Sequence, residues 1–395
     1  AFAAVVAPVA PRLAALGLAA AALGALQQYP RKTLDIGWSD LLAALRFALF
    51  PGSKSRASLE GSIARQWSSE GDAIVCLSVR TGMDLVLTKL ELPKGSEVLF
   101  VPGVTIPALL DIVKAHGLQA MGVDPPSAGE LLVPELKPHV TAQTRVVVVT
   151  HLFGAILDVG PLIREAKELG LFVIEDCAQA FLGAAPAGLG GGKWSQGFRG
   201  HEEADAAFVS FGVMKTLTAL GGAVGRVRDA KLRQGMQELQ ATFPVRPGSQ
   251  FLAAALKACA LKALGRPWLF GLALTLVTLC GFSFDKLIVA SVRGFPNRDS
   301  HRQRPSLPLL RLLARRLRDQ RSATLEDAVP GTSALARRRA SAALVASRLA
   351  EAGVEVVAHA PGVTNSWWLL PVLDDDPKGL VRGLCARGFD ATCTS

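Results

Sequence analysis

The pattern of apolar and polar residues changes character near Asp72. Before it, the chain has two Ala- and Leu-rich runs, residues 13–26 and 40–50, and the second of these stops at a Pro-Gly pair. The first is shorter than the roughly 20 apolar residues that cross a bilayer, and a signal-peptide remnant, an interfacial helix and a core helix all remain open for it. The pattern predicts that residues 1–68 form an apolar helical extension and a linker.

Beyond Asp72, short apolar segments alternate with amphipathic ones, which indicates strands separated by single helices. Residues 144–150 (TRVVVVT) have no polar face, so this strand is expected to be covered on both sides. Single-helix crossovers predict an α/β fold with a mainly parallel sheet and helices on both faces, here a large domain over residues 69–245. The expected strands are 73–77, 97–101, 118–123, 144–150, 171–174 and 206–211.

An apolar interruption follows at residues 246–305. Residues 251–264 are mostly apolar, and the 18 residues 267–284 carry no charge. Gly265-Arg266-Pro267 separates the two runs. Neither run spans a bilayer comfortably, so we expect an apolar helical hairpin whose residues 251–284 lie in one leaflet of a membrane. A buried core hairpin and a dimer contact are the alternatives. Cations lie in and around the hairpin, as an anionic lipid surface would favour: Arg246, Lys257, Lys262, Arg266, Lys286, Arg293, Arg298, Arg302 and Arg304.

Residues 306–395 predict a small C-terminal α/β domain. The pattern indicates an arginine-rich helix, two further helices and two strands, at residues 306–320, 333–352, 377–387, 354–358 and 367–373. Another strand begins at Gly388-Phe389-Asp390, immediately before the chain ends, so we expect this domain to be incomplete.

Composition narrows the class of partner. Half of the 395 residues are hydrophobic, the mean hydropathy is +0.33 and the formal net charge is +10. A basic and apolar chain without zinc-finger spacing or aromatic-basic interleaving favours an anionic membrane surface, and we expect no nucleic-acid partner. The six cysteines are scattered without a C-x-x-C pair, so we expect reduced thiols and no metal site.

Three kinds of residue needed for pyridoxal phosphate (PLP) chemistry occur in order. Asp176 ends an apolar strand, Ser210 ends another, and Lys215 follows in the segment Ser210-Phe211-Gly212-Val213-Met214-Lys215. A lysine amine bonds to the cofactor aldehyde, a carboxylate keeps the pyridine nitrogen protonated, and hydroxyl and N–H groups hold the phosphate. The sequence therefore indicates a PLP site at the carboxyl ends of the strands.

Residues 77–228 resemble the DegT/StrS family of PLP-dependent sugar aminotransferases, which has the aspartate-aminotransferase-like fold type I. Four segments in the family's order carry the resemblance. They are PKGSEVL at 93–99, VTHLFG at 149–154 followed by Asp158, IEDCAQA at 174–180, and the stretch from Ser210 to Gly222. The resemblance implies a PLP enzyme of fold type I and, with it, a homodimer.

The resemblance also implies roles for single residues. Lys215 would hold the cofactor and move the proton, and Asp176 would pair with the pyridine nitrogen. Gln179 would lie near the ring and Ser210 would bind the phosphate. His151 is expected to be a structural residue at a strand end.

The first helix after the first strand would donate N–H groups to the same phosphate. The resemblance places these groups at Thr81 and Gly82, with Arg80 and Met83 as neighbouring choices because the alignment can shift by a residue.

Three departures from the family pattern bear on specificity. Ile106 stands where the family has an aromatic residue over the cofactor ring, so we expect apolar contact there. The sequence Ala219-Leu220-Gly221-Gly222 replaces Gly-Glu-Gly-Gly. The apolar hairpin displaces the region that reaches into the neighbouring subunit's site, and Asn297 is the nearby candidate to replace it.

Together these features predict a PLP-dependent aminotransferase associated with a membrane surface, in a compartment that the sequence leaves open. It would transfer an amino group from an amino-acid donor to a carbonyl acceptor, with a keto sugar as one choice. The alternative is an aminotransferase-like structural subunit of a membrane assembly whose site is unused. A Rossmann-type nucleotide binder is disfavoured because no G-x-G-x-x-G follows the first strand.

Overall fold

The computed structural model describes residues 27–31, 33–50, 52–103, 106–124, 133–181, 198–280, 298–320, 334–354, 356–357 and 364–393. The chain separates into two compact units. The larger comprises residues 35–256 and 295–373, and the smaller comprises residues 1–34, 257–294 and 374–395. The predicted helix at 13–26 and the candidate Asn297 lie outside the described residues. The predicted domain boundaries stay a prediction.

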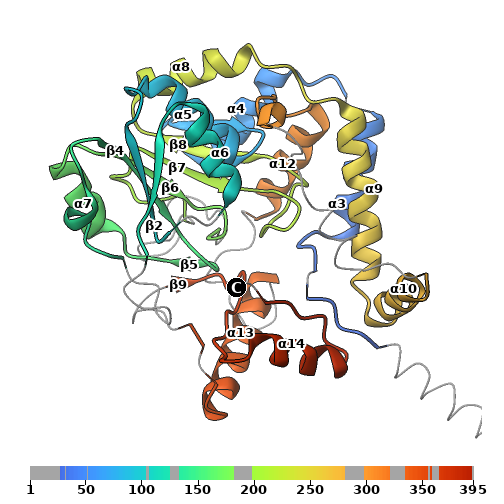
Figure 1. Cartoon of the computed structure of the whole chain (residues 1–395). Helices are drawn as coiled ribbons and strands as arrows, with labels where there is room; N and C mark the ends of the chain where they lie inside the picture. Colours follow the sequence, from blue (N-terminus) through green and yellow to red (C-terminus); the bar gives the residue numbers. More distant parts are fainter. Residues whose placement is uncertain are drawn as a thin grey trace, which may run out of the picture. The chain divides into compact units, whose positions relative to one another are not determined.

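The larger unit is built on a seven-stranded sheet in the order β1-β8-β7-β6-β4-β2-β3 (Figure 1). Strands β2, β3, β4, β6 and β7 run parallel to one another, while β8 is antiparallel to both β1 and β7. The mainly parallel α/β fold is therefore confirmed. The strands are β1 Ala73–Cys76, β2 Glu97–Val101, β3 Gln119–Gly122, β4 Thr144–Thr150, β6 Phe172–Asp176, β7 Ala206–Ser210 and β8 Ala223–Val227.

Hydrophobic cores lie on both faces of this sheet, because successive strand side chains point to opposite sides. Val146 and Val148 of β4 belong to one core, and Val147 and Val149 belong to the other. The first core includes residues of the helices α5 Val79–Leu90, α6 Pro107–Ala115 and α8 Ala230–Ala241, and the second includes residues of α7 Gly160–Glu168. The expectation that residues 144–150 are covered on both sides is confirmed.

Helix α5 crosses the sheet at very close range. A Cβ added to Gly82 would lie 2.4 Å from the ring of Phe208 on β7, and one added to Gly225 on β8 would lie 2.3 Å from the same ring. Both glycines are therefore required by packing, because the phenyl ring fills the space that any side chain would need.

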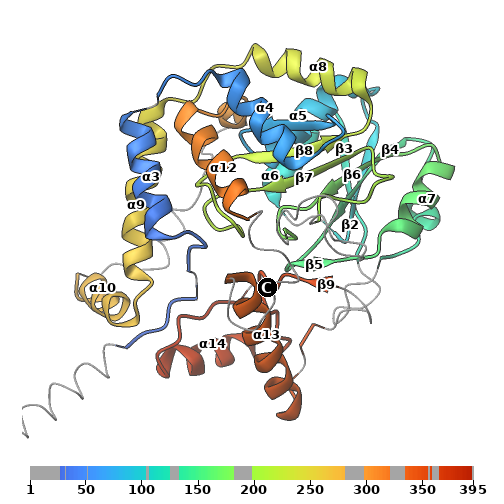
Figure 2. The same cartoon turned by 180° about the vertical axis from the view of Figure 1, so that it is seen from behind.

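Three further helices of the larger unit pack together: α3 Trp38–Leu49, α4 Arg56–Trp67 and α12 Leu307–Gln320 (Figure 2). Helix α4 corrects the expectation of a linker before Asp72. Its buried side chains Leu59, Ile63 and Trp67 recur every four residues and form an apolar stripe, and Ser55 caps its first turn.

The larger unit also contains a second sheet of two short strands. Strand β5 Ala155–Ile156 pairs with β9 Thr364–Asn365, and helix α13 Ala334–Glu351 precedes β9 in the chain. Among the described residues, the expected strands at 354–358 and 367–373 are represented by a single bridge between Val356 and Val372.

The predicted hairpin is formed by helices α9 Gly248–Leu264 and α10 Pro267–Leu279. No single helix among the described residues is long and apolar enough to cross a bilayer; α9 and α10 reach that hydropathy only together, and they are bent by 105° at their junction. In the smaller unit, Tyr29 bridges Phe389 near helix α14 Pro377–Ala386, and the two rings stack at 5.3 Å.

Candidate functional site

The residues chosen from the sequence gather at the carboxyl ends of two neighbouring strands. Asp176 is the last residue of β6, Ser210 is the last of β7, and Lys215 follows β7 after one turn. The parallel register places Asp176 opposite Phe208, two residues before Ser210. Lys215 and Asp176 are close enough for the charge of each to act on the pKa of the other.

The amine of Lys215 is unusually easy to deprotonate. Burial lowers its pKa from 10.5 to about 8, Asp176 opposes this change, and the positive charge of Arg80 reinforces it. At pH 7 about one-tenth of such an amine is neutral, compared with about 0.03% for an ordinary lysine. Lys215 therefore has the free base that attack on a carbonyl requires.

Asp176 is a carboxylate in a dry environment. Burial raises its pKa, while the N–H of Ala178, which donates to Oδ1 at 2.9 Å, and the charge of Lys215 oppose that rise. A buried carboxylate is stabilised in its charged form only by a cationic or hydrogen-bonding partner. Asp176 is therefore suited to hold a protonated ring nitrogen.

Gln179 and Ser210 also lie at this edge of the sheet. The side-chain carbonyl of Gln179 accepts a hydrogen bond from the N–H of Phe153 at 2.8 Å, which fixes the orientation of its amide. The hydroxyl oxygen of Ser210 accepts from the N–H of Gly212 at 3.3 Å, so its own proton can be donated elsewhere. Their contacts with a cofactor stay a prediction.

The N–H groups of Thr81 and Gly82 at the start of α5 have hydrogen-bond partners within the chain. The N–H of Thr81 donates to Oγ of Ser78 at 3.2 Å, its hydroxyl donates to the carbonyl of His301 at 2.8 Å, and the N–H of Gly82 donates to the carbonyl of Ser78 at 3.1 Å. Ser78 therefore caps the first turn of α5 and already engages the N–H groups of Thr81 and Gly82. The predicted contact of Thr81 and Gly82 with a phosphate stays a prediction, and Gly82 also serves the packing against Phe208.

Ile106 is the residue immediately before α6, and its partly buried side chain packs against the core on the α5 side of the sheet. Its contact with a cofactor ring stays a prediction.

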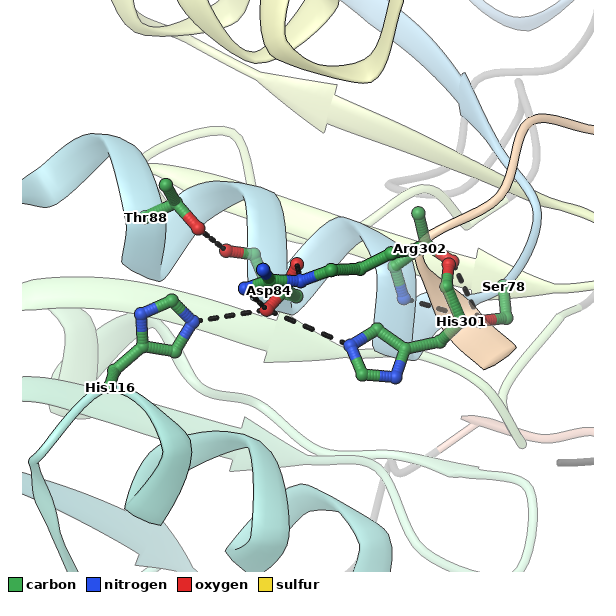
Figure 3. Close-up of polar contacts among 7 residues, drawn as sticks. Ser78, Asp84, Thr88, His116, His301 and Arg302 are labelled. Atoms are coloured by element: carbon green, nitrogen blue, oxygen red, sulfur yellow. Dashed lines mark hydrogen bonds and ion pairs between the residues drawn. The ribbon is translucent and has the colours of Figure 1, made fainter. Parts of the chain in front are cut away.

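A buried ionic network, which sequence reasoning missed, holds α5 in place (Figure 3). The carboxylate of Asp84 accepts two hydrogen bonds from Arg302, at 2.9 and 2.8 Å, and lies 3.0 Å from Nε2 of His116. Nε2 of His301 is 3.6 Å away, an ion-pair distance rather than a hydrogen bond. Burial would raise the pKa of Asp84, but these basic partners lower it well below the usual range.

A second network clamps the loop after Lys215. Leu217 has a φ of 56°, and its N–H donates to Oδ2 of Asp35 at 3.0 Å. Arg338 donates to the same oxygen at 3.2 Å and to the hydroxyl of Thr216 at 3.0 Å. Arg316 donates to the carbonyl of Thr218 at 3.2 Å. This clamp holds a strained backbone beside the reactive lysine.

The segment after β9 reaches the lysine itself. The indole N–H of Trp368 donates to the carbonyl of Met214 at 2.8 Å, and its ring centroid lies 4.2 Å from Nζ of Lys215. Ser366 and Leu369 donate backbone hydrogen bonds to the carbonyls of Gly154 and Phe153. The adjacent pair Trp367-Trp368 was the available sequence signal, because two tryptophans are rare in a chain with 6% aromatic residues.

His151 and Glu175 form a buried pair beside the site. The N–H of Leu157 donates to Nδ1 of His151 at 3.2 Å, so the ring proton lies on Nε2 and is donated to Glu175 at 2.8 Å. Together with Cys177 they are close enough to share a metal ion, but burial raises the pKa of the Cys177 thiol well above its ordinary value. This arrangement supports a structural role for His151, and the absence of a metal site stays a prediction.

Known proteins are similar to this chain in both sequence and fold. The sequence profile of the DegT/DnrJ/EryC1/StrS aminotransferase family matches residues 48–253, slightly more than half of the chain. GDP-perosamine synthase of Escherichia coli O157:H7 is 30% identical over 143 residues, 36% of each chain. UDP-N-acetyl-3-dehydro-alpha-D-glucosamine 3-aminotransferase of Acidithiobacillus ferrooxidans is 30% identical over 191 residues, 48% of each chain.

Two solved structures show the same fold. The aminotransferase TlmJ from Streptoalloteichus hindustanus superposes with a TM-score of 0.60 at 18% identity, covering 92% of this chain and 82% of TlmJ. DesV of S. venezuelae, solved with a ketimine intermediate, superposes with a TM-score of 0.57 at 21% identity, covering 89% of this chain and 78% of DesV. The matched regions span only 33% to 48% of the length of the curated relatives.

Proposed function

The chain belongs to the DegT/DnrJ/EryC1/StrS aminotransferase family, and from that premise we propose that it is a PLP-dependent aminotransferase. An amino-acid donor would give up its amino group and leave as a keto acid, and a carbonyl acceptor would take the same group and become an amine. The observation that carries the proposal is the pairing of Lys215, whose pKa is lowered to about 8, with the buried Asp176 at adjacent strand ends.

The residues present fit this cofactor. When bound, PLP supplies an aldehyde that receives the amino group and a protonated ring that withdraws electrons. Lys215 would hold the aldehyde carbon and, once released, would take a proton from the substrate carbon and return it. Asp176 would keep the ring nitrogen protonated, which supplies the cationic partner that its own burial demands.

The phosphate group would lie at the start of α5. The helix dipole favours an anion there, and the Arg80 side chain adds a positive charge that acts on Lys215. Ser210 would donate its hydroxyl proton to the same group.

A keto sugar is the acceptor that we favour. Relatives of 30–32% identity are named GDP-perosamine synthase and dTDP-3-amino-3,6-dideoxy-alpha-D-galactopyranose transaminase. A second copy of the chain would complete the site, as the family resemblance implies. Sedimentation of the purified protein with its cofactor tests this: a dimer is expected, and a cofactor-loaded monomer would contradict it.

The cofactor itself gives the direct test of the enzymatic reading. The purified protein should take up PLP and absorb visible light, and borohydride reduction should fix the cofactor to the peptide that contains Lys215. Lys215→Ala should lose both signals, while exchange of an exposed lysine, Lys378→Ala, should lose neither. A wild-type protein that takes up no PLP would support the alternative of an unused site in a structural subunit.

The apolar hairpin supports a further proposal, that the enzyme works at a membrane surface. Five large apolar side chains of α9 and α10 are between 41% and 78% exposed: Leu256, Trp268, Leu272, Leu276 and Leu279. Exposed apolar side chains at this density favour an interface with lipid or protein over water.

The cations near the hairpin do not all face outward. The amine of Lys262 donates to the carbonyl of Leu34 at 3.2 Å, so it serves the smaller unit rather than lipid headgroups. Lys257 and Arg266 stay candidates for headgroup contact.

Flotation with vesicles containing one-third phosphatidylserine tests the membrane proposal. Wild type should float, and a variant with Leu272, Leu276 and Leu279 changed to Ser should stay at the bottom while keeping its cofactor absorbance. If the wild-type protein does not float with the vesicles, the hairpin contacts another protein surface and the membrane proposal is wrong.

A further inference from the structure

The wall of the site beside the reactive nitrogen is an aromatic ring. Among the described residues, Nζ of Lys215 lies 4.2 Å from the ring centroid of Trp368, a distance at which an ammonium is attracted to the face of an indole. Nζ is also the atom that would bond to the cofactor aldehyde. Any carbonyl that exchanges with this nitrogen must therefore react within contact distance of the ring.

The ring cannot easily move away from this place. Its N–H is bound to the carbonyl of Met214, the residue immediately before Lys215, so ring and lysine are tied to the same short stretch of backbone. The backbone on either side of Trp368 is anchored as well. The N–H of Ser366 donates to Gly154 at 2.8 Å, and the N–H of Leu369 donates to Phe153 at 3.1 Å.

Gly154 allows this close approach. It has a φ of 98°, and a Cβ at this position would lie 2.5 Å from Oγ of Ser366 and 2.6 Å from the backbone nitrogen of Trp368. The loop after β4 is thus shaped to receive the segment that carries the ring. Gln179 supports the same loop by accepting from the N–H of Phe153.

We propose that Trp368 positions and shields the reactive lysine. Its indole face holds Nζ of Lys215 in place, and it keeps water and small nucleophiles away from the bond that this nitrogen makes with the cofactor. The proposal rests on the proposed function. An apolar ring excludes water, while its π face still tolerates the charge of the amine. Leucine at this position would retain apolar volume but lose the flat ring and the hydrogen bond to Met214.

The test compares wild type with Trp368→Phe, Trp368→Leu and Trp38→Leu, the last being an exposed tryptophan at the start of α3. Each protein is loaded with PLP, and borohydride trapping verifies attachment at Lys215. Hydroxylamine is then added, and the loss of visible absorbance gives the rate at which the cofactor is stripped. We expect stripping about tenfold faster in Trp368→Leu, within about threefold of wild type in Trp368→Phe, and unchanged in Trp38→Leu.

A second readout uses the cofactor-free proteins. Trinitrobenzenesulfonate labels amines, and peptide mapping gives the labelling rate of Lys215 alone, which should rise in Trp368→Leu. Equal rates for wild type and Trp368→Leu in both readouts would overturn the proposal. If wild type takes up no PLP but its labelling rate depends on Trp368, the proposed function fails while the shielding of the lysine stands.

Discussion

Asp84 and Arg302 are 218 residues apart in sequence and are joined by two hydrogen bonds, of 2.9 and 2.8 Å, at the flank of helix α5. The pair ties the helix that begins at Val79 to the segment that follows the apolar hairpin (Figure 3). His301 in that segment also accepts a hydrogen bond from Thr81 through its carbonyl. The position of the first turns of α5 therefore depends on a contact made far along the chain.

The change Asp84→Asn should destabilise the protein. It leaves Arg302 and two histidines around a neutral group, which we expect to lower the free energy of unfolding by about 2 kcal/mol at pH 7. The lowered pKa of Asp84 stabilises the fold above pH 3.8, its ordinary pKa, and this contribution is lost as the pH falls further. Urea unfolding at pH 7 and at pH 3 should thus show a smaller difference between wild type and variant at the lower pH.

A surface carboxylate provides the control for this measurement. Glu351 pairs with Arg348 on an exposed face of α13, and Glu351→Gln should change stability by less than about 0.5 kcal/mol. An equal effect of the two substitutions would mean that the Asp84 network is not a stabilising element.

The attachment of PLP should depend on pH through the Lys215 amine. Because burial lowers the pKa of Lys215 to about 8 and only the neutral amine attacks an aldehyde, the attachment rate should rise about tenfold per pH unit below 8 and level off above it. Stopped-flow absorbance over pH 6 to 10 checks this. A midpoint near 10.5 would show that the amine is solvated like an ordinary lysine.

The change Asp176→Asn should separate binding from chemistry. The amide keeps the size of the side chain but cannot hold a cationic ring nitrogen, so cofactor binding is expected to survive while the half-reaction with an amino-acid donor slows by about 100-fold or more. Single-turnover absorbance with a panel of amino acids measures this. Glu202→Gln, at an exposed carboxylate, is the control. An unchanged rate in Asp176→Asn would show that Asp176 does not pair with the ring nitrogen of the cofactor.

The change Gly154→Ala should disturb the wall formed by Trp368. The new methyl group would collide with Ser366 and with the backbone of Trp368, so we expect a loss of several kcal/mol in stability or a displaced segment. Gly170→Ala is a matched control, since Gly170 has a similar positive φ of 70° and no atom within 4 Å of the added Cβ. That variant should lose only about 1 kcal/mol from backbone strain. Thermal unfolding of Gly154→Ala and Gly170→Ala separates the effect of the steric collision from that of backbone strain at a positive φ.

The parts of the fold that sequence reasoning predicted are those that local pattern determines. The apolar run TRVVVVT at 144–150 indicated a strand covered on both faces, and β4 is such a strand. Asp176 and Ser210 were expected at strand ends for the same reason, since each closes an apolar segment. Strand β8 was not predicted, because its five residues contain Gly225 and Arg226 and give no clear alternation.

The contacts that sequence reasoning missed depend on residues far apart in the chain. Nothing near Asp35 indicates that it accepts a hydrogen bond from Leu217, and nothing near Trp368 indicates that it lies against Lys215. One missed contact is local: Ser78 caps α5 and accepts a hydrogen bond from the N–H of Thr81.

Because Phe208 packs between Gly82 and Gly225, substitutions at these three positions, which are distant in sequence, depend on one another. Neither glycine can be replaced by a residue with a side chain while the phenyl ring is present. A smaller residue at position 208 would leave a cavity unless a larger residue replaced one of the glycines. Relatives of this protein should therefore exchange volume among these three positions rather than vary them singly. A library that randomises Phe208, Gly82 and Gly225 together should yield folded variants. For some of these, every intermediate with a single substitution should be unstable.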